Sequence, residues 1–195
     1  MTATVLLIRH AAHVELDRRL SGRRADVALS DAGRAQAGAL GARLAGQELT
    51  RVECSPLDRT HATAVAIASA CNLPPPQDVD ALLEIDMGDW TGRRLDSFGD
   101  DPAWRVWNEH RGTARIPGGE SMVEAQARVV AHLQTLREGT IALVTHSDMI
   151  RAAVAHVLGL SLDHLLRFDI DPASVTTVVI GDWGAKLLSL NVRTG

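Results

Sequence analysis

Apolar and polar positions along the chain predict strands and helices in alternation. Residues 5–8 form a short, continuously apolar run, which is typical of a strand buried on both faces. The last two predicted strands flank Gly181-Asp182-Trp183-Gly184, so they should form a hairpin. We expect strands over residues 5–8, 50–54, 140–145, 175–180 and 186–190, with a strand or extended segment at 80–85.

Several segments have apolar residues at helical spacing and a polar residue suited to cap the first turn. Ser30 is an expected N-cap, Ser55 is a second with Asp58 at the third helical position, and Ser121 with Glu124 makes a capping-box pattern. Helices are expected over residues 30–44, 55–70, 121–136 and 147–158, with one more at 102–109 inside an irregular stretch from 88 to 119. Strands that alternate with helices predict an α/β sheet covered by helices on both faces.

Length and charge limit the classes of protein that fit. A chain of 195 residues is long enough for one domain, so residues 1–195 are expected to form a single unit. The formal charge of −4 carries no block of one sign, and we therefore expect no nucleic-acid partner. Lys186 is the only lysine among 20 cationic residues, and the arginines are suited to bidentate phosphate contacts.

The ends and the cysteines predict an intracellular protein. The apolar run at residues 5–8 has no basic segment before it, is too short for a secretion signal, and ends in Arg9-His10. No stretch is long enough to span a membrane, and Cys54 and Cys71 make neither a disulfide framework nor a metal knuckle. We expect a reduced, cytoplasmic protein without a membrane partner, and a homodimer is one open oligomeric state.

Three predicted strand-to-helix junctions carry polar side chains. The first ends in Arg9-His10, the second is Ser55 to Arg59, and the third carries His146. In open α/β sheets the carboxyl ends of the strands border the ligand crevice, and helix N-termini there favour anions. Two arginines and two histidines at one sheet edge therefore predict a phosphate site.

Other interpretations of the same residues are open. Each residue alone could belong to a surface loop or could be a structural histidine. His10 and His13 form an H-x-x-H pair, to which Cys54, His61 and His146 could add metal ligands. A strand exit does not place two imidazoles on one helical face, so we predict no metal and no cofactor.

The ordered motifs resemble those of the histidine phosphatase superfamily, whose fold is called phosphoglycerate mutase-like. The match runs from residue 5 to about residue 151. The matching segments are residues 9–11 (RHA), 21–22 (SG), 26–33 (DVALSDAG), 55–60 (SPLDRT), 84–92 (EIDMGDWTG), 117–121 (PGGES) and 144–146 (VTH). Ala11 stands where the family has glycine, which a negative φ would tolerate, and Ala12, His13 and Leu16 stand where it often has polar residues.

The resemblance implies a three-layer α/β/α sandwich with a mainly parallel central sheet, and a phosphoryl-transfer site. His10 would be the nucleophile and form a phosphohistidine, with its second ring nitrogen held by a carbonyl. Glu84 would be the general acid, and a protonated His146 would add positive charge. The implied phosphate-binding residues are Arg9, Arg59, Ser21 and Gly22.

The sequence identifies the substrate pocket less clearly than it identifies the phosphate site. Residues at about 89–117 are expected to form an insertion in the pocket wall, and their aromatic residues could either pack it or form a shelf for substrate. Arg23 could hold a second anionic group or be solvated, and His13 could replace a missing phosphate contact. The candidate pocket residues are Arg23, His13, Trp90 and Trp104.

Together these features predict a metal-independent phosphomonoester hydrolase that acts on small phosphorylated metabolites. The first alternative is a mutase, which must keep water away from phosphohistidine. Mutases of the family have a longer chain whose tail closes the site, so a chain that stops at Gly195, after its last predicted strand, favours hydrolysis. The second is a non-catalytic phosphate-binding relative, in which His10 or Glu84 would be expected to be lost.

Overall fold

The computed structural model describes residues 1–193, so the predicted chain end at Thr194 and Gly195 lies outside the described residues. Its centre is one six-stranded sheet of order β3-β2-β4-β1-β5-β6. The first four strands in that order are parallel, and β5 runs antiparallel to both of its neighbours. The strands are β1 (Thr2–Arg9), β2 (Leu49–Cys54), β3 (Gln77–Asp78), β4 (Gly139–Thr145), β5 (Val175–Gly181) and β6 (Gly184–Val192).

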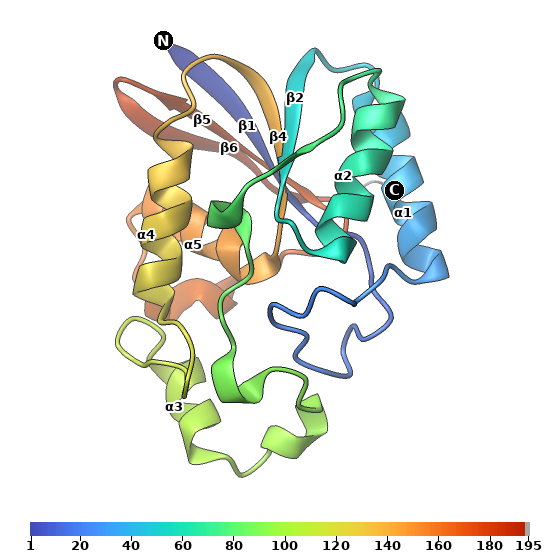
Figure 1. Cartoon of the computed structure of the whole chain (residues 1–195). Helices are drawn as coiled ribbons and strands as arrows, with labels where there is room; N and C mark the ends of the chain where they lie inside the picture. Colours follow the sequence, from blue (N-terminus) through green and yellow to red (C-terminus); the bar gives the residue numbers. More distant parts are fainter. Residues whose placement is uncertain (194–195) are drawn as a thin grey trace.

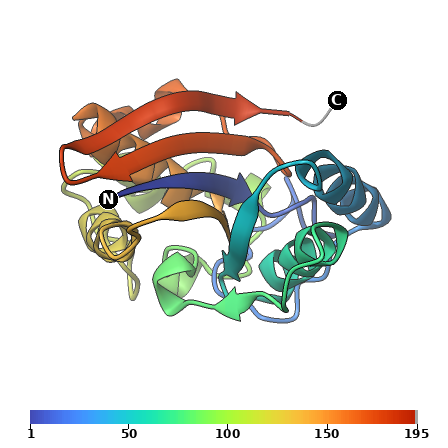
Figure 2. The same ribbon diagram turned by 90° about the horizontal axis from the view of Figure 1, so that it is seen from above.

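Helices cover both faces of this sheet, which confirms the predicted three-layer α/β/α sandwich with a mainly parallel centre. Figures 1 and 2 show one pair of helices on each side of the strands. The helices α1 (Asp31–Leu44) and α2 (Asp58–Ala70) pack together on one face, and α4 (Met122–Leu133) and α5 (Ser147–Leu158) pack together on the other. The short helix α3 (Pro102–Glu109) lies beyond the carboxyl ends of the strands, at the bottom of Figure 1.

The apolar run in β1 serves both layers at once. Val5 and Leu7 point into the core shared with α4 and α5, and Leu6 and Ile8 point into the core shared with α1 and α2. Because side chains alternate along a strand, a central strand between two helical layers needs apolar residues at every position. The continuous run therefore marks β1 as a central strand, with β4 and β5 on its two edges.

Of the three predicted N-cap residues, two are correct and one is wrong. The Ser30 side chain accepts a hydrogen bond from the Gly33 amide, and Ser121 and Glu124 form the predicted capping box at α4. Ser55 does not cap α2, which begins at Asp58 and has no side-chain cap. The reason is that Ser55 lies in an extended segment before the helix, where its hydroxyl contacts the His146 ring instead.

The stretch between β3 and α4 consists mainly of short turns and irregular segments. The predicted strand or extended segment at 80–85 begins as a 3-10 turn, Asp80–Leu82, and has no regular structure after it. Two more 3-10 turns, Gly88–Trp90 and Leu95–Phe98, precede α3, and a last one, Leu162–Arg167, follows α5. These turns bring Glu84 to the carboxyl edge of the sheet. Among residues 1–193, no helix is both long and apolar enough to cross a membrane.

Candidate active site

The three strand-to-helix junctions meet at one edge of the sheet. The His10 amide donates to the Thr145 carbonyl at 2.9 Å, and the Ser55 amide donates to the Val144 carbonyl at 3.0 Å. These bonds hold the ends of β1 and β2 on either side of the end of β4. As a result, the His10 and His146 ring centroids lie 5.2 Å apart.

His10 is buried and held in one tautomer. Its Nδ1 lies 2.8 Å from the Ala11 carbonyl oxygen, and because a carbonyl only accepts, Nδ1 carries the proton. The Nε2 atom is then the ring nitrogen with a free lone pair. Burial and the neighbouring Arg59 and Arg9 hold the pKa of His10 well below its usual value, so the imidazole is neutral. A neutral imidazole with one free nitrogen is a competent nucleophile.

Arg9 and Arg59 each have a buried nitrogen without a partner. Arg9 Nη1 donates to the Ile170 carbonyl at 2.6 Å, and Arg59 Nη2 donates to the Gly22 carbonyl at 2.7 Å. These bonds fix the planes of the two guanidinium groups. The Nε of each, however, is buried with no hydrogen-bond partner among the described residues. Both arginines also line the same cavity as His10, and two permanently charged guanidinium groups there make a site for an anion.

His146 is fully buried and neutral in this structure. Arg59 Nη2 lies 3.3 Å from His146 Nδ1, and since arginine can only donate, Nδ1 accepts. His146 Nε2 therefore carries the proton and donates to Ser55 Oγ at 3.0 Å. Burial, followed by the charge of Arg59, holds the pKa of His146 well below its usual value. The imidazole is thus neutral here, and the negative charge of a bound phosphate would favour its protonated form.

Glu84 is a carboxyl group poised to carry a proton. Burial, followed by the negative charge of Asp148, raises the pKa of Glu84 to about 7. Asp148 behaves in the opposite way: burial opposes its ionisation, but Arg111 and Arg151 at 3.1 and 3.2 Å hold its pKa below the usual value. Two neighbouring carboxyl groups whose pKa values are pushed apart divide into one proton carrier and one fixed charge.

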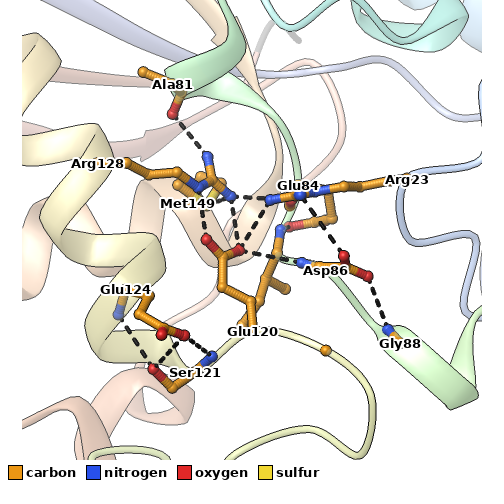
Figure 3. A network of polar contacts seen from close by, with 12 residues as sticks. Arg23, Ala81, Glu84, Asp86, Gly88, Glu120, Ser121, Glu124, Arg128 and Met149 are labelled. Carbon is orange, nitrogen blue, oxygen red and sulfur yellow. Dashed lines mark hydrogen bonds and ion pairs between the residues drawn. The ribbon is translucent and has the colours of Figure 1, made fainter.

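The main chain at Glu84 is held by two arginines. Its carbonyl oxygen accepts from Arg23 Nε at 2.8 Å and from Arg128 Nη2 at 3.0 Å (Figure 3). Glu120 Oε2 accepts from both guanidinium groups, at 3.0 and 3.1 Å, and from the Asp86 amide at 3.2 Å. The Glu120 carboxylate thus links the three segments that contain Arg23, Asp86 and Arg128.

A cavity of about 160 Å³ opens beside His10. Seven of the residues singled out from the sequence line it: Arg9, His10, His13, Ser21, Gly22, Arg59 and Glu84. Ser21 donates its hydroxyl to Glu15 at 2.8 Å. Burial and Arg59 lower the pKa of His13 to about 4, so His13 is a neutral wall residue 5.3 Å from the His10 ring.

The other four candidates, His146, Arg23, Trp90 and Trp104, do not line this cavity. Arg23 turns toward Glu84 and Glu120, as described above. Trp90 is buried, with its ring centroid 5.3 Å from that of Trp104 and 5.9 Å from that of Phe98. This packing matches the interpretation that the aromatic residues anchor residues 89–117 to the core. From that range only Leu95 reaches the cavity wall, within the part of the chain that the structure describes.

Three small-residue positions lie in the loops around the site. Ala11 is not among the non-glycine residues with positive φ, so it fits a position where the family has glycine. A Cβ on Gly33 would lie 1.8 Å from the Ala12 carbonyl oxygen, so only glycine lets α1 approach the loop after His10. Gly22 has a φ of +52°, and a Cβ there would lie 3.0 Å from Thr91 Oγ1, so glycine also suits the residue whose carbonyl accepts from Arg59.

Sequence reasoning missed several residues of the cavity wall and of the ion pairs that support it. Asp148 and Arg151 lie three positions apart at the start of α5, where they face one another, and that spacing was a usable signal. Arg111, Arg128 and the partners of Glu120 gave no such signal, because their contacts join segments far apart in the chain. The wall residues Leu20 and Met87 were not singled out either, whereas Leu16 was, at a position where the family often has a polar residue.

The candidate metal ligands separate into two places. Among residues 1–193, one group of at least three His, Cys, Asp or Glu side chains has ligand atoms within 4.8 Å of one another, and it comprises Cys54, His61 and Asp78. Neither His10 nor His13 nor His146 belongs to it. The cavity beside His10 is lined by Arg9, Arg59 and Glu84, and the two arginines suit a phosphate.

Comparison with known proteins agrees with this chemistry. A family model described as the histidine phosphatase superfamily (branch 1) matches residues 5–193. Phosphoserine phosphatase 1 of Hydrogenobacter thermophilus is 31% identical over 175 residues, which cover 86% of this chain and 82% of that protein. A probable phosphoglycerate mutase of Salmonella choleraesuis is 36% identical over 164 residues, which cover 80% of this chain and 75% of that protein.

Solved structures show the same architecture. A mycobacterial glucosyl-3-phosphoglycerate phosphatase aligns with a TM-score of 0.85 and 26% identity, over 99% of this chain and 100% of that one. The sheet and its two helical layers are thus shared with this phosphatase.

Proposed function

The chain belongs to the histidine phosphatase superfamily, and from this premise we propose that it hydrolyses phosphomonoesters of small metabolites through a phosphohistidine, without a metal. One observation carries the proposal furthest. Arg9 and Arg59 line the same cavity as a neutral His10. A phosphoryl group is an anion whose oxygens would pair with both guanidinium groups while its phosphorus faces the imidazole.

The first half of the reaction transfers the phosphoryl group to the protein. His10 Nε2 forms a bond to phosphorus as the bond to the leaving oxygen breaks. Arg9 and Arg59 hold the charge that spreads over the other phosphate oxygens. Glu84, protonated near neutral pH, gives its proton to the leaving oxygen, which departs as an alcohol.

The second half returns the protein to its first state. Glu84, now a carboxylate, takes a proton from a water molecule, whose oxygen bonds to phosphorus as the bond to His10 Nε2 breaks. Inorganic phosphate leaves, and Glu84 is again protonated. The Ala11 carbonyl keeps the His10 ring in one orientation through both steps, because it holds the Nδ1 proton.

We also propose that residues 1–195 act as one domain, with residues 89–117 as an insertion anchored by its tryptophans. Ser21, Gly22 and His13 would shape the phosphate end of the cavity, since all three line it. Trp90 and Trp104 would support the wall from behind. Leu16, Leu20 and Met87, together with the charged Asp17, Arg19 and Asp148, would form the wall that the leaving group meets.

Hydrolysis and mutase transfer are separated by the fate of the phosphoryl group. We expect inorganic phosphate to appear much faster than an isomer when the protein is given 3-phosphoglycerate, with or without a bisphosphate primer. The same assay should include phosphoserine and glucosyl-3-phosphoglycerate, the substrates named for two similar phosphatases. Rapid interconversion of 2- and 3-phosphoglycerate with little free phosphate would overturn the hydrolase proposal.

Activity should not depend on a metal ion. Arg9 and Arg59 supply the positive charge that a metal would otherwise bring to the phosphate oxygens. We expect prolonged treatment with a chelator, followed by its removal, to leave kcat/KM unchanged within about twofold. Orthovanadate, which can adopt the five-coordinate geometry of the transition state, should inhibit. Loss of activity on chelation that added zinc or manganese restores would contradict the proposal.

A further inference from the structure

Three potential ligands from separate elements converge beside the sheet edge. Cys54 and Asp78 are the last residues of β2 and β3 and are paired directly in the parallel register, so their side chains project to the same side. His61 lies in the first turns of α2, which packs against β2. None of the three lines the cavity beside His10.

The three ligand atoms form a triangle of well-defined size. Cys54 Sγ lies 3.4 Å from Asp78 Oδ1 and 3.8 Å from His61 Nδ1, and the last two atoms are 3.1 Å apart. A tetrahedral zinc ion with ordinary bond lengths would set sulfur about 3.6 Å from a nitrogen or oxygen ligand and would set nitrogen about 3.3 Å from oxygen. The observed triangle differs from that tetrahedral face by about 0.2 Å on each side.

We propose that Cys54, His61 and Asp78 form a binding site for a zinc-like divalent cation, with water as the fourth ligand. A thiolate, a carboxylate and a neutral imidazole together carry two negative charges, which match the two positive charges of the ion. The mixture of sulfur, nitrogen and oxygen donors favours zinc or cobalt over magnesium or calcium, which prefer oxygen ligands alone. The site stands apart from the phosphate-transfer chemistry, so it does not rest on the proposed function.

The protons of the site have a defined fate when the ion binds. Burial and the Asp78 carboxylate raise the pKa of the Cys54 thiol, so without an ion the thiol is protonated. Binding breaks the S–H bond, forms the bond from sulfur to the metal and releases that proton to the solvent. His61 binds through the Nδ1 lone pair, with its ring proton on Nε2.

The burial of the three ligands leaves an entry path for the ion from the solvent. Cys54 is fully buried, whereas the side chains of His61 and Asp78 are 45% and 52% exposed. An ion can therefore meet the imidazole and carboxylate at the surface and then bond to the thiolate beneath them. Water at the open side completes the tetrahedron, as in zinc sites with three protein ligands.

The competing explanation is a cluster closed by hydrogen bonds alone. In that case the Cys54 thiol and the His61 ring both donate to Asp78, and nothing replaces their protons. The two explanations differ in whether a divalent ion removes the thiol proton. Cobalt reports on this directly, because a thiolate bound to Co²⁺ gives a strong near-ultraviolet charge-transfer absorption.

The test is a titration of the chelator-treated, reduced protein with Co²⁺ and then Zn²⁺. We expect one Co²⁺ per chain, a thiolate charge-transfer band, release of about one proton, and loss of the band when Zn²⁺ displaces Co²⁺. Cys54→Ser should abolish the band, and Asp78→Asn should weaken binding at least about tenfold. Asp78 is half-exposed, so this variant is expected to fold.

The second cysteine provides the matched control. Cys71 lies at the end of α2, outside the cluster, and Cys71→Ser should bind Co²⁺ like the parent protein. Absence of the band in the parent protein would overturn the proposal in favour of the hydrogen-bonded cluster. A band that survives Cys54→Ser but disappears in Cys71→Ser would overturn it as well, by placing the ion elsewhere. Phosphatase activity should be the same in the Co²⁺-free and Zn²⁺-loaded protein within about twofold, since none of the ligands faces the cavity.

Discussion

Replacing His10 with alanine is expected to reduce phosphate release by roughly four to six orders of magnitude, because it removes the atom that attacks phosphorus. The remaining residues would still bind an anion, since Arg9 and Arg59 keep their bonds to the Ile170 and Gly22 carbonyls. We therefore expect kcat to fall while vanadate binding persists. The measurement is phosphate release together with a vanadate-binding titration on both proteins.

The covalent intermediate can be located directly. The parent protein, mixed with substrate and quenched in alkali, should carry an acid-labile phosphoryl group on the peptide that contains His10. His13→Ala is the matched control, because its ring lies 5.3 Å from that of His10 and shares its neutral state. This variant should still form the labelled His10 peptide. Label on His13 or on a serine, or substantial activity in a folded His10→Ala protein, would contradict the assignment.

Replacing Glu84 with glutamine is expected to slow the hydrolysis of an alkyl phosphate by roughly two to four orders of magnitude. An alkoxide is a poor leaving group and needs the proton that Glu84 carries. A nitrophenolate leaves without one, so the loss on p-nitrophenyl phosphate should be about tenfold or less. The measurement is the pair of kcat/KM ratios for the two substrates under the same conditions.

The pH profile provides a second test of the same residue. The active form carries a protonated Glu84, whose pKa is about 7, so kcat/KM for an alkyl phosphate should fall as pH rises through that value. The decline approaches tenfold per pH unit and should be absent in Glu84→Gln. His10, with its lowered pKa, stays neutral until well below its usual range and places no limit near neutral pH. Equal losses on both substrates, or an unchanged alkaline limb, would leave Glu84 with only a structural role.

The fold was predictable because its signals are local. The apolar run in β1 identified a central strand, and Ser30 and Ser121 marked helix starts that the structure contains. Ser55 failed as a cap because its hydroxyl contacts His146, which lies far away in the sequence. β3 was missed because a two-residue strand carries too little pattern to stand out from a loop.

The site was predictable to the extent that strand ends meet at one sheet edge. Arg9, His10, Arg59, Glu84 and His146 lie together, as the motif order implied. The charge state of His146 was not predictable, because it depends on burial and on a contact with Arg59. The Arg111–Asp148 pair and the Glu120 network were also out of reach, since each joins side chains that only the folded chain brings together.

The position of β1 in the sheet constrains how the protein can be made. This strand is translated before the other strands of the sheet, yet its two neighbours, β4 and β5, follow only after β2 and β3. A growing polypeptide therefore carries an apolar segment with two unpaired edges until most of the message has been read. His10 cannot meet His146 before that moment, so no shorter nascent chain can hydrolyse a phosphate ester. Such late, long-range pairing slows folding, and chaperones that bind extended apolar strands should find β1 during synthesis.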